Sequence, residues 1–181
     1  TSIPLEYNVE LFFEGSMIKL YWYDEKWNMA TSKHIDASKN KWTSDKNFSI
    51  LFEEALNNSF NCENYDDFLK SLDKNFCYTY LLQHPENKMT YPIATALVFE
   101  INKVNLQNLE EQRQESINLN THKNINDLNN NNYILYYKGD NSKNFTRVKL
   151  LTDDYYRMSE LRGCYPDIGL TYINLLHLGV E

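Results

Sequence analysis

The sequence predicts an α+β fold in which helices flank antiparallel β-sheets. Short segments rich in Tyr, Phe, Val and Ile recur along the chain, and such segments are typical of strands. Other segments place apolar residues three and four positions apart, which is the spacing of a helix that buries one face. Gly and Pro are scarce, with 5 and 4 among 181 residues, so the composition is neither linker-like nor collagen-like. We expect one domain over residues 1–181.

The amino-terminal region predicts a strand and then a hairpin. Residues 9–13 form the first predicted strand, and residues 17–23 and 27–32 form the hairpin, joined by a turn at YDEKW. The aromatic side chains of the hairpin could stack on nucleic-acid bases. Packing within the hairpin is the more common use of such a cluster, and we favour it. The residues concerned are Tyr21, Trp22, Tyr23 and Trp27.

Two helices are predicted next. The first has Thr43 or Ser44 as its amino-terminal cap and ends at Asn57-Asn58. The second covers residues 64–72 and begins with acidic residues, which suit the positive end of the helix dipole. The residues expected to be buried are Phe48, Leu51, Phe52, Ala55 and Leu56 in the first helix, and Phe68 and Leu72 in the second.

The middle of the chain predicts two strands, a helix and a loop. The strands cover residues 75–83 and 93–101, and the polar segment 84–92 forms the turn between them. A helix is predicted over residues 106–119. The Asn-rich segment 120–132 follows it, and this composition is typical of a solvated loop.

The last third predicts a hairpin and two helices. The hairpin covers residues 132–151, with its turn at 138–141, and Thr152 then caps an acidic first helical turn. This helix runs to Arg162 and is closed by Gly163. A final helix follows Pro166 and stops at Gly179. The apolar residues that we expect it to bury are Leu170, Ile173, Leu176 and Leu178.

The composition limits the classes of partner. The net charge is -7, so a nucleic-acid partner would need a basic patch that opposes the overall charge. The cysteines are three in number and have no metal-ligand spacing, which indicates reduced thiols and an intracellular protein. The four histidines have no ligand spacing either, so no metal is expected. No apolar run is long enough to cross a membrane. Because the chain begins with Thr1, we expect its native amino terminus to be missing.

Three blocks of sequence carry a resemblance to a known superfamily. They are FFEGSMIKLYWYDEKWNMATSKHIDA, YTYLLQHPENKM and NYILYYKGDNSKNFTRVKLLTDDYYRMSELRG. In this order they resemble the adenylating domain of covalent nucleotidyltransferases, which include RNA ligases, DNA ligases and mRNA capping enzymes. The RNA ligases of phages and of large DNA viruses are the most similar. The resemblance implies a nucleotidyltransferase-like fold and a viral protein.

The resemblance also implies a chemistry, and most of its residues are missing. In active members a lysine attacks the α-phosphate of ATP or GTP, with Mg²⁺ held by acidic residues. The position of this lysine falls on Phe12. The acid two residues later becomes Glu14, and Gly15 is kept. The acid of the middle block falls on Leu81, while Lys19 lies in the next strand and is a poor substitute for the nucleophile.

The remaining motifs are kept only in part. The family's Glu-Gly pair falls near Asn131-Asn132, whereas its K-x-K motif survives as Arg147-Val148-Lys149. The basic element after the hairpin survives at Lys33. Lys33, Arg147 and Lys149 could line a relic phosphate site, while Glu14 and Gly15 could be either a nucleotide-contacting remnant or simply the end of a strand. Basic residues of this kind are nevertheless more often part of a solvated face.

The sequence therefore favours a degenerate, non-catalytic protein that acts as a binding or structural subunit of a larger viral assembly. Other protein subunits are the expected partners, no cofactor is expected, and the location would be cytoplasmic or virion-associated. Two alternatives remain open. One is an active RNA ligase or capping-type nucleotidyltransferase that uses ATP and Mg²⁺. The other is a nucleic-acid-binding module that uses Lys33, Arg147 and Lys149 without catalysis, which the net charge disfavours.

Overall fold

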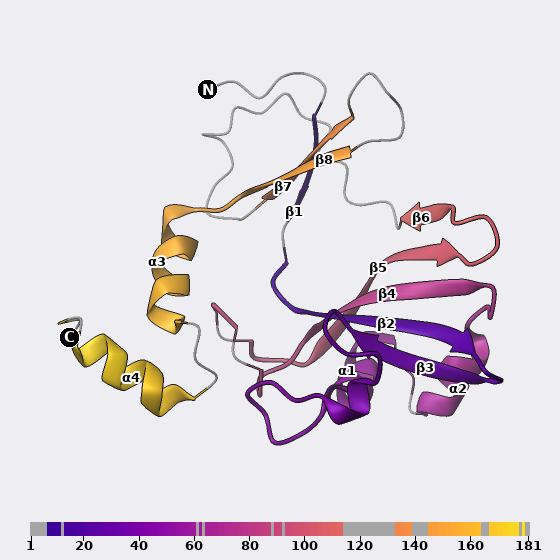
Figure 1. Ribbon diagram of the computed structural model, residues 1–181, viewed down its shortest axis with the longest axis horizontal. Coiled ribbons are helices and arrows are strands. Elements are labelled where there is room, and N and C mark those ends of the chain that lie inside the picture. Colours follow the sequence, from indigo (N-terminus) through magenta and orange to yellow (C-terminus); the bar gives the residue numbers. More distant parts are fainter. Residues whose placement is uncertain are drawn as a thin grey trace. The chain divides into compact units, whose positions relative to one another are not determined.

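The computed structural model divides into two compact units (Figure 1). It describes residues 7–11, 13–60, 62, 64–87, 89–91, 93–113, 133–138, 145–163, 167–177 and 179. Unit 1 comprises residues 1–13 and 115–163, and unit 2 comprises residues 14–114 and 164–181. The α+β class that the sequence predicts is confirmed, since antiparallel sheets and helices make up the described chain.

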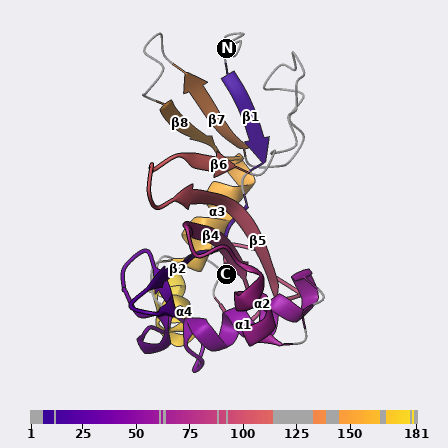
Figure 2. The same cartoon turned by 90° about the vertical axis from the view of Figure 1, so that its right-hand side faces the viewer.

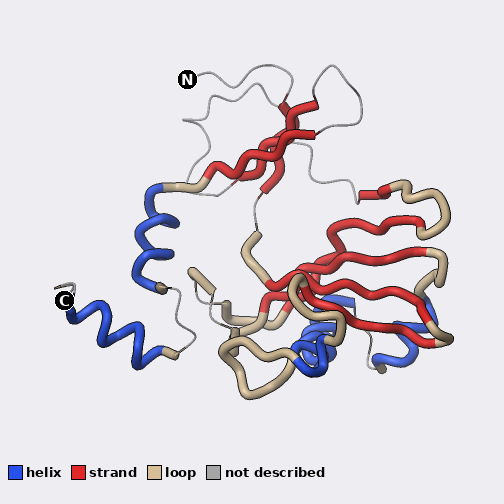
Figure 3. Tube along the Cα trace, in the orientation of Figure 1, coloured by secondary structure: helices blue, strands red, loops and turns tan. Residues whose placement is uncertain are grey.

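Unit 2 is built on a five-stranded antiparallel sheet with the order β3-β2-β4-β5-β6 (Figure 3). Its first two strands form the predicted hairpin. Asp24 and Glu25, at its tip, both have positive φ, as a two-residue hairpin turn requires. The strands are β2 (Ser16–Tyr23), β3 (Lys26–Thr31), β4 (Phe76–Gln83), β5 (Leu97–Asn105) and β6 (Glu111–Arg113).

One face of this sheet carries the core of unit 2. Helix α1 (Phe48–Phe60) and helix α2 (Tyr65–Ser71) pack on it (Figure 2). Phe52 of α1 lies at the centre, with its ring 5.5 Å from that of Tyr80 and 6.3 Å from that of Phe68. Burying an aromatic or aliphatic side chain of this size contributes about 1.5–3 kcal/mol. The sheet supplies Ile18, Leu20, Tyr78, Tyr80, Leu82 and Val98 to this core.

The predicted helix residues behave largely as expected. Phe48, Leu51, Phe52, Ala55 and Leu56 are buried, as is Phe68, while Leu72 is only half-buried. The predicted cap of α1 is wrong. The Oδ1 atom of Asn47 accepts the backbone N–H of Ile50, whereas the Ser44 hydroxyl bonds to Glu86. The helix also continues past Asn57-Asn58 to Phe60, because Ser59 still faces the core side and bonds to Ala55.

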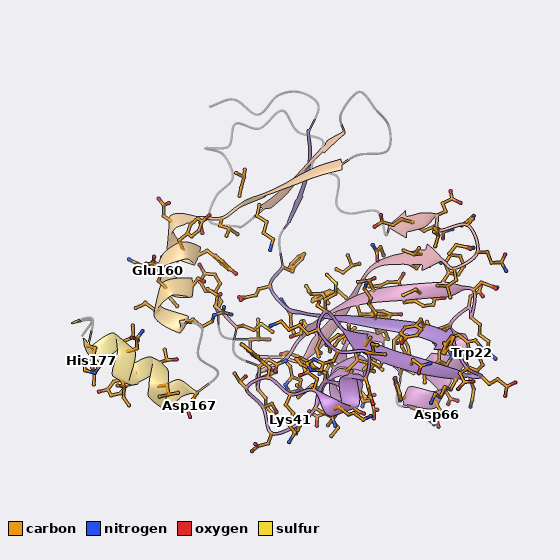
Figure 4. All side chains as sticks on the ribbon, viewed as in Figure 1. Trp22, Lys41, Asp66, Glu160, Asp167 and His177 are labelled. Carbon is orange, nitrogen blue, oxygen red and sulfur yellow. The ribbon has the colours of Figure 1, made fainter. Side chains whose placement is uncertain are left out.

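The aromatic hairpin packs on itself, as we favoured. The rings of Trp22 and Trp27 meet edge to face at 5.7 Å, and Trp27 lies 6.2 Å from Tyr78. Lys74 covers the Trp22 ring at 3.7 Å, at the end of the sheet where Figure 4 labels this tryptophan. Only Tyr23 of the predicted cluster is largely exposed.

Two predicted elements of unit 2 are wrong or displaced. The strand predicted at 93–101 is β5, which runs from Leu97 to Asn105 and pairs with β4 along its whole length. The helix predicted from residue 106 is replaced by a turn at residues 106–108 and the short strand β6. The Asn105 side chain accepts the N–H groups of Gln107 and Asn108, which stabilises that turn. Residues 114–132, with the predicted Asn-rich loop, lie outside the described residues.

Unit 1 contains a three-stranded antiparallel sheet with the order β1-β7-β8, and helix α3. The strands are β1 (Tyr7–Leu11), β7 (Tyr133–Lys138) and β8 (Phe145–Leu150). The predicted strand at 9–13 therefore begins and ends two residues earlier. Helix α3 (Asp153–Arg162) starts at the Thr152 cap and ends at Gly163, with φ 64°, as predicted.

Helix α4 (Ile168–His177) forms where the last helix was predicted, but none of its described side chains is buried. Leu170, Ile173 and Leu176 each expose more than half of their surface, which corrects the prediction that they join the core. Helical spacing predicts a helix, yet only contacts from the rest of the chain bury its apolar face. Leu178 lies outside the described residues.

Candidate functional site

The Glu14-Gly15 pair lies immediately before β2 and is held by the chain that follows β4. The Glu14 carboxylate accepts the Thr90 backbone N–H at 2.7 Å with one oxygen and the Thr90 hydroxyl at 2.8 Å with the other. The Glu14 carbonyl accepts a bond from the Gln83 side chain at 2.7 Å. Thr90 is only 4% exposed. Both oxygens of this carboxylate therefore already have protein partners in a largely buried place.

Gly15 is required at its position by a close approach. A Cβ atom there would lie 2.7 Å from Leu81 Cγ and 2.8 Å from the backbone oxygen of Leu82. Contacts this short do not occur between real Cβ atoms and their neighbours, and the carbonyl cannot rotate away without breaking the strand. The glycine thus allows the chain to enter β2 flat against β4.

Leu81, at the position of the missing acid, lies in an apolar row. It pairs with Met17 of β2 on one side and with Phe99 of β5 on the other. Because side chains alternate along a strand, these three lie on the sheet face opposite the core. Lys19, two residues after Met17, shares this face, pairs with Thr79 and is exposed.

The residues that the resemblance assigns to nucleotide and metal do not fit Mg²⁺ and ATP. Magnesium prefers several oxygen ligands in octahedral geometry. The described candidates supply one carboxylate, Glu14, whose oxygens are used by Thr90, while Leu81 has no ligand atom. Phe12, Asn131 and Asn132 lie outside the described residues. We therefore derive no reaction step through these groups.

A second polar cluster joins the turn after β4 to the start of α1. Lys46 Nζ lies 2.9 Å from a Glu54 oxygen and 2.5 Å from a Glu86 oxygen. His84, only 5% exposed, places Nε2 at 3.1 Å from Glu54, and its Nδ1 accepts the Glu86 backbone N–H at 3.2 Å. The Ser44 hydroxyl donates to Glu86 at 2.6 Å. Five side chains from two distant segments thus form one network.

The charges in this network stabilise one another. The Lys46 ammonium, followed by the Ser44 hydroxyl, lowers the pKa of the Glu86 carboxyl below its ordinary value. In return, hydrogen bonds to Glu86 and then to Glu54 raise the pKa of Lys46. Both groups are partly exposed, so solvent screens each ion pair and weakens its contribution to stability.

The same cluster is the one set of described residues with metal-ligand spacing in three dimensions. Ligand atoms of Glu54, His84 and Glu86 lie within 4.8 Å of one another. The Lys46 ammonium, however, lies between the two carboxylates, where it already supplies the positive charge. The arrangement is that of an internally neutralised ionic network. The expectation that the protein holds no metal stays a prediction.

Asn87 ends this turn with an unusual side chain. Its backbone N–H donates to the His84 carbonyl at 3.0 Å, and the residue is 4% exposed. Among the described residues, neither its Nδ2 nor its Oδ1 has a hydrogen-bond partner. A buried water is the usual partner of such groups. The Pro-Glu-Asn sequence of the turn belongs to the resemblance, but nothing in it indicated a buried amide.

The other predicted site residues belong to other elements of the chain than Glu14 and Gly15 do. Lys33 is exposed in the loop after β3 of unit 2. Arg147 and Lys149 lie two residues apart in β8 of unit 1, and the Lys149 side chain is exposed. Of the five predicted site residues, Glu14, Gly15 and Lys33 belong to unit 2, and Arg147 and Lys149 belong to unit 1.

Sequence reasoning missed Thr90, Gln83, Lys46, Glu54 and His84 as members of the polar clusters. They are separated by up to 76 residues from their partners, as for Thr90 and Glu14. No spacing rule connects residues so far apart. The one usable signal was the polar turn at 84–92, which was assigned only as a connection between strands.

Comparison with known proteins shows that the chain is similar to viral proteins. No family model matches it. It is 24% identical over an alignment of 192 residues to the "Immediate-early protein ICP-46 homolog" of Invertebrate iridescent virus 6, which covers 90% of this chain and 42% of that protein. A protein of the same name from Invertebrate iridescent virus 3 is 32% identical over 75 residues, or 41% of this chain and 16% of that protein. The chain therefore spans less than half the length of these curated relatives.

The relatives support the predicted affinity to proteins of large DNA viruses. The name of these relatives refers to early expression and does not state a biochemical activity. Among the described residues, no helix is both long and apolar enough to cross a membrane.

Proposed function

We propose that this chain is a catalytically inactive relative of the covalent nucleotidyltransferases that serves as a binding subunit in a viral protein assembly. The observation that carries the proposal is the apolar row of Met17, Leu81 and Phe99. In the resemblance, Leu81 occupies the position of a catalytic acid. A row of apolar side chains cannot hold a metal ion or neutralise phosphate groups.

The Glu14-Gly15 turn supports the same proposal from another direction. Its shape is maintained by the bonds to Thr90 and the close contact with Leu81 and Leu82. Its carboxylate contributes to the fold. In this motif the geometry that supports the fold is kept and the reactive residues are lost. We expect this combination in a protein that is retained for binding. The viral relatives support the viral part of the proposal.

The test is covalent labelling. The purified chain is incubated with α-labelled ATP or GTP and Mg²⁺ or Mn²⁺, then separated under denaturing conditions beside an active RNA ligase. We expect label on the ligase and none on this chain. A labelled band would overturn the proposal and support the active-enzyme alternative.

A matched pair of variants identifies the reacting group if label appears. Lys19→Ala removes the exposed lysine on the same sheet face as Leu81, and Lys26→Ala removes an exposed lysine at the hairpin tip. Loss of label in the first variant alone would assign the chemistry to Lys19. Equal labelling of both variants would direct the search to Lys33 or Lys149.

A further inference from the structure

The loop between β3 and α1 carries a local charge opposite to that of the chain. Residues 33–42, KHIDASKNKW, contain three lysines and one aspartate, a local charge of +2, whereas the chain as a whole carries -7. Lys33, Lys39 and Lys41 are exposed. The single acid, Asp36, accepts the backbone N–H and the hydroxyl of Ser38 and pairs with Lys39 at 3.3 Å. This segment, the 33–42 loop, is therefore a basic island on an acidic protein.

The same loop exposes large apolar side chains. Ile35 is 81% exposed and Trp42 is 45% exposed. Tryptophan is among the residues that contribute most to binding at protein interfaces, and an exposed isoleucine in the same loop adds apolar area to be buried. Lys41, adjacent to Trp42, is labelled in Figure 4, where it extends from this loop. Apolar anchors surrounded by charges are the usual composition of a binding surface.

The backbone of the loop is fixed although its side chains are exposed. At its start, the Thr31 hydroxyl accepts the N–H of His34 at 3.1 Å and a bond from the Asn40 side chain at 3.3 Å. In its middle, Ala37 is fully buried in the core and begins the short 3-10 helix η1 (Ala37–Lys39). At its end, the Asn40 carbonyl accepts the N–H of Phe48. A surface held in this way loses little conformational freedom on binding.

We propose that the 33–42 loop is a docking surface for an acidic segment, bearing large apolar side chains, of a partner protein. This inference rests on the proposed function, since it names the chemistry of the partner that a binding subunit would hold. The lysines complement carboxylates, and Trp42 and Ile35 supply apolar area. Exposed Lys39 can exchange its weak pair with Asp36 for a partner carboxylate at little cost.

The charge distribution favours a short acidic peptide over a nucleic acid. At physiological ionic strength the Debye screening length is about 8 Å. A short bound segment therefore interacts electrostatically mainly with the charges of the loop itself. Outside the loop the chain carries -9, which repels a long polyanion that extends beyond the basic island. A nucleic acid also offers little aliphatic surface to bury against Ile35, because its bases are aromatic and its backbone is charged.

The test measures binding of a defined probe by fluorescence anisotropy. The probe is a fluorescein-labelled twelve-residue peptide in which Glu and Asp alternate with Leu and Phe. A matched peptide carries Gln and Asn in place of the acids, and a labelled oligouridylate of twelve nucleotides is the polyanion. We expect the acidic peptide to bind most tightly, with an affinity that falls as salt is raised. Tighter binding of the oligouridylate, or equal binding of the neutral peptide, would overturn the proposal.

Variants locate the surface. Lys39→Glu combined with Lys41→Glu should weaken peptide binding about tenfold, and Trp42→Ala about fivefold or more. The controls are Lys26→Glu and Tyr23→Ala, which change an exposed lysine and an exposed aromatic residue at the hairpin tip and should leave the affinity within about twofold. Equal affinities in the loop and control variants would overturn the assignment of the surface.

The outcome is independent of covalent labelling. A chain that labels with nucleotide yet binds the peptide through the loop would refute the proposed function alone. A chain that neither labels nor binds the peptide would refute the docking surface alone.

Discussion

Two polar regions of unit 2 use their charges in opposite ways. At the end of β4 and in the turn after it, polar side chains bond to other protein groups: Gln83 and Thr90 bond to Glu14, and His84 and Glu86 join the network around Lys46. The 33–42 loop has an equally ordered backbone but directs its lysines and Trp42 to solvent. Ordered polar residues therefore indicate a binding function only where their side chains remain available to a partner. The turn should therefore govern stability, and the loop should govern binding.

The largest effect is expected at the junction that the turn supports. Gly15→Ala should lower the free energy of unfolding by about 3 kcal/mol, since the new methyl group meets the Leu82 carbonyl as well as the Leu81 side chain. Urea denaturation measures it. Gly169→Ala, in exposed α4, should change stability by less than about 1 kcal/mol. Equal effects of the two substitutions would contradict the close approach at Gly15.

Loss of the Thr90 hydroxyl should come second. Thr90→Val keeps the shape of the side chain but leaves one oxygen of the Glu14 carboxylate without its donor, which should cost about 2 kcal/mol. Thr90→Ser keeps the donor and should cost less than half as much. Thermal and urea unfolding both measure the difference. If valine and serine destabilise the protein equally, the hydrogen bond does not stabilise this junction.

Removing the cation of the network should have a smaller effect that depends on pH. Lys46→Met should lower the free energy of unfolding at neutral pH by less than Thr90→Val does, because solvent screens the partly exposed pairs. The folded state lowers the pKa of Glu86, so its contribution is present above the ordinary value of 4.5 and is lost as pH falls through the lowered pKa. The difference in free energy of unfolding between the wild type and the Lys46→Met variant should therefore decrease at acidic pH.

At high pH the contribution of Lys46 to stability decreases as pH rises, opposite to the dependence for Glu86. The folded state raises the pKa of Lys46, so its contribution is complete below the ordinary value of 10.5 and is lost as pH rises through the raised pKa. Unfolding measured across both ranges provides the test. A gap of constant size from acid to alkali would show that the lost stability comes from packing of the lysine stem.

The smallest change in stability is expected in the loop. Lys39→Glu with Lys41→Glu should alter the free energy of unfolding by less than about 0.5 kcal/mol, because both side chains are exposed. Urea denaturation measures this change, and the Lys46→Met variant is measured alongside for comparison. A loss as large as that of Lys46→Met would show that the loop lysines support the fold, and the contrast between the two regions would disappear.

Local patterns predicted most elements because they depend on neighbouring residues. The hairpin of β2 and β3, the buried face of α1 and the Thr152 cap of α3 all follow from spacing within a few positions. Where long-range contacts decide, prediction was wrong. Residues 106–113 form no helix because Asn105 stabilises a turn that returns the chain to pair with β5. Helix α4 formed, yet its apolar face was not buried.

The candidate site was predictable only where the resemblance assigned residues. Glu14 and Gly15 were identified, but the partner that holds Glu14 lies 76 positions away and carries no signal of its own. The charge reversal of the 33–42 loop was visible in the sequence. Its significance depended on the burial of Ala37, which no local pattern shows, because that burial distinguishes a fixed surface from an ordinary solvated loop.

The order of the chain has a consequence for how the protein is made. Strand β1 pairs with β7, and the pair Leu11 and Tyr133 encloses nearly all of unit 2. On the ribosome β1 emerges about 120 residues before its partner, a delay of roughly 6–24 s at typical rates of synthesis. The five-stranded sheet can form during this interval, while β1 waits with unpaired backbone groups. A protein of this topology thus exposes one strand edge to chaperones or to neighbouring chains until translation passes β7.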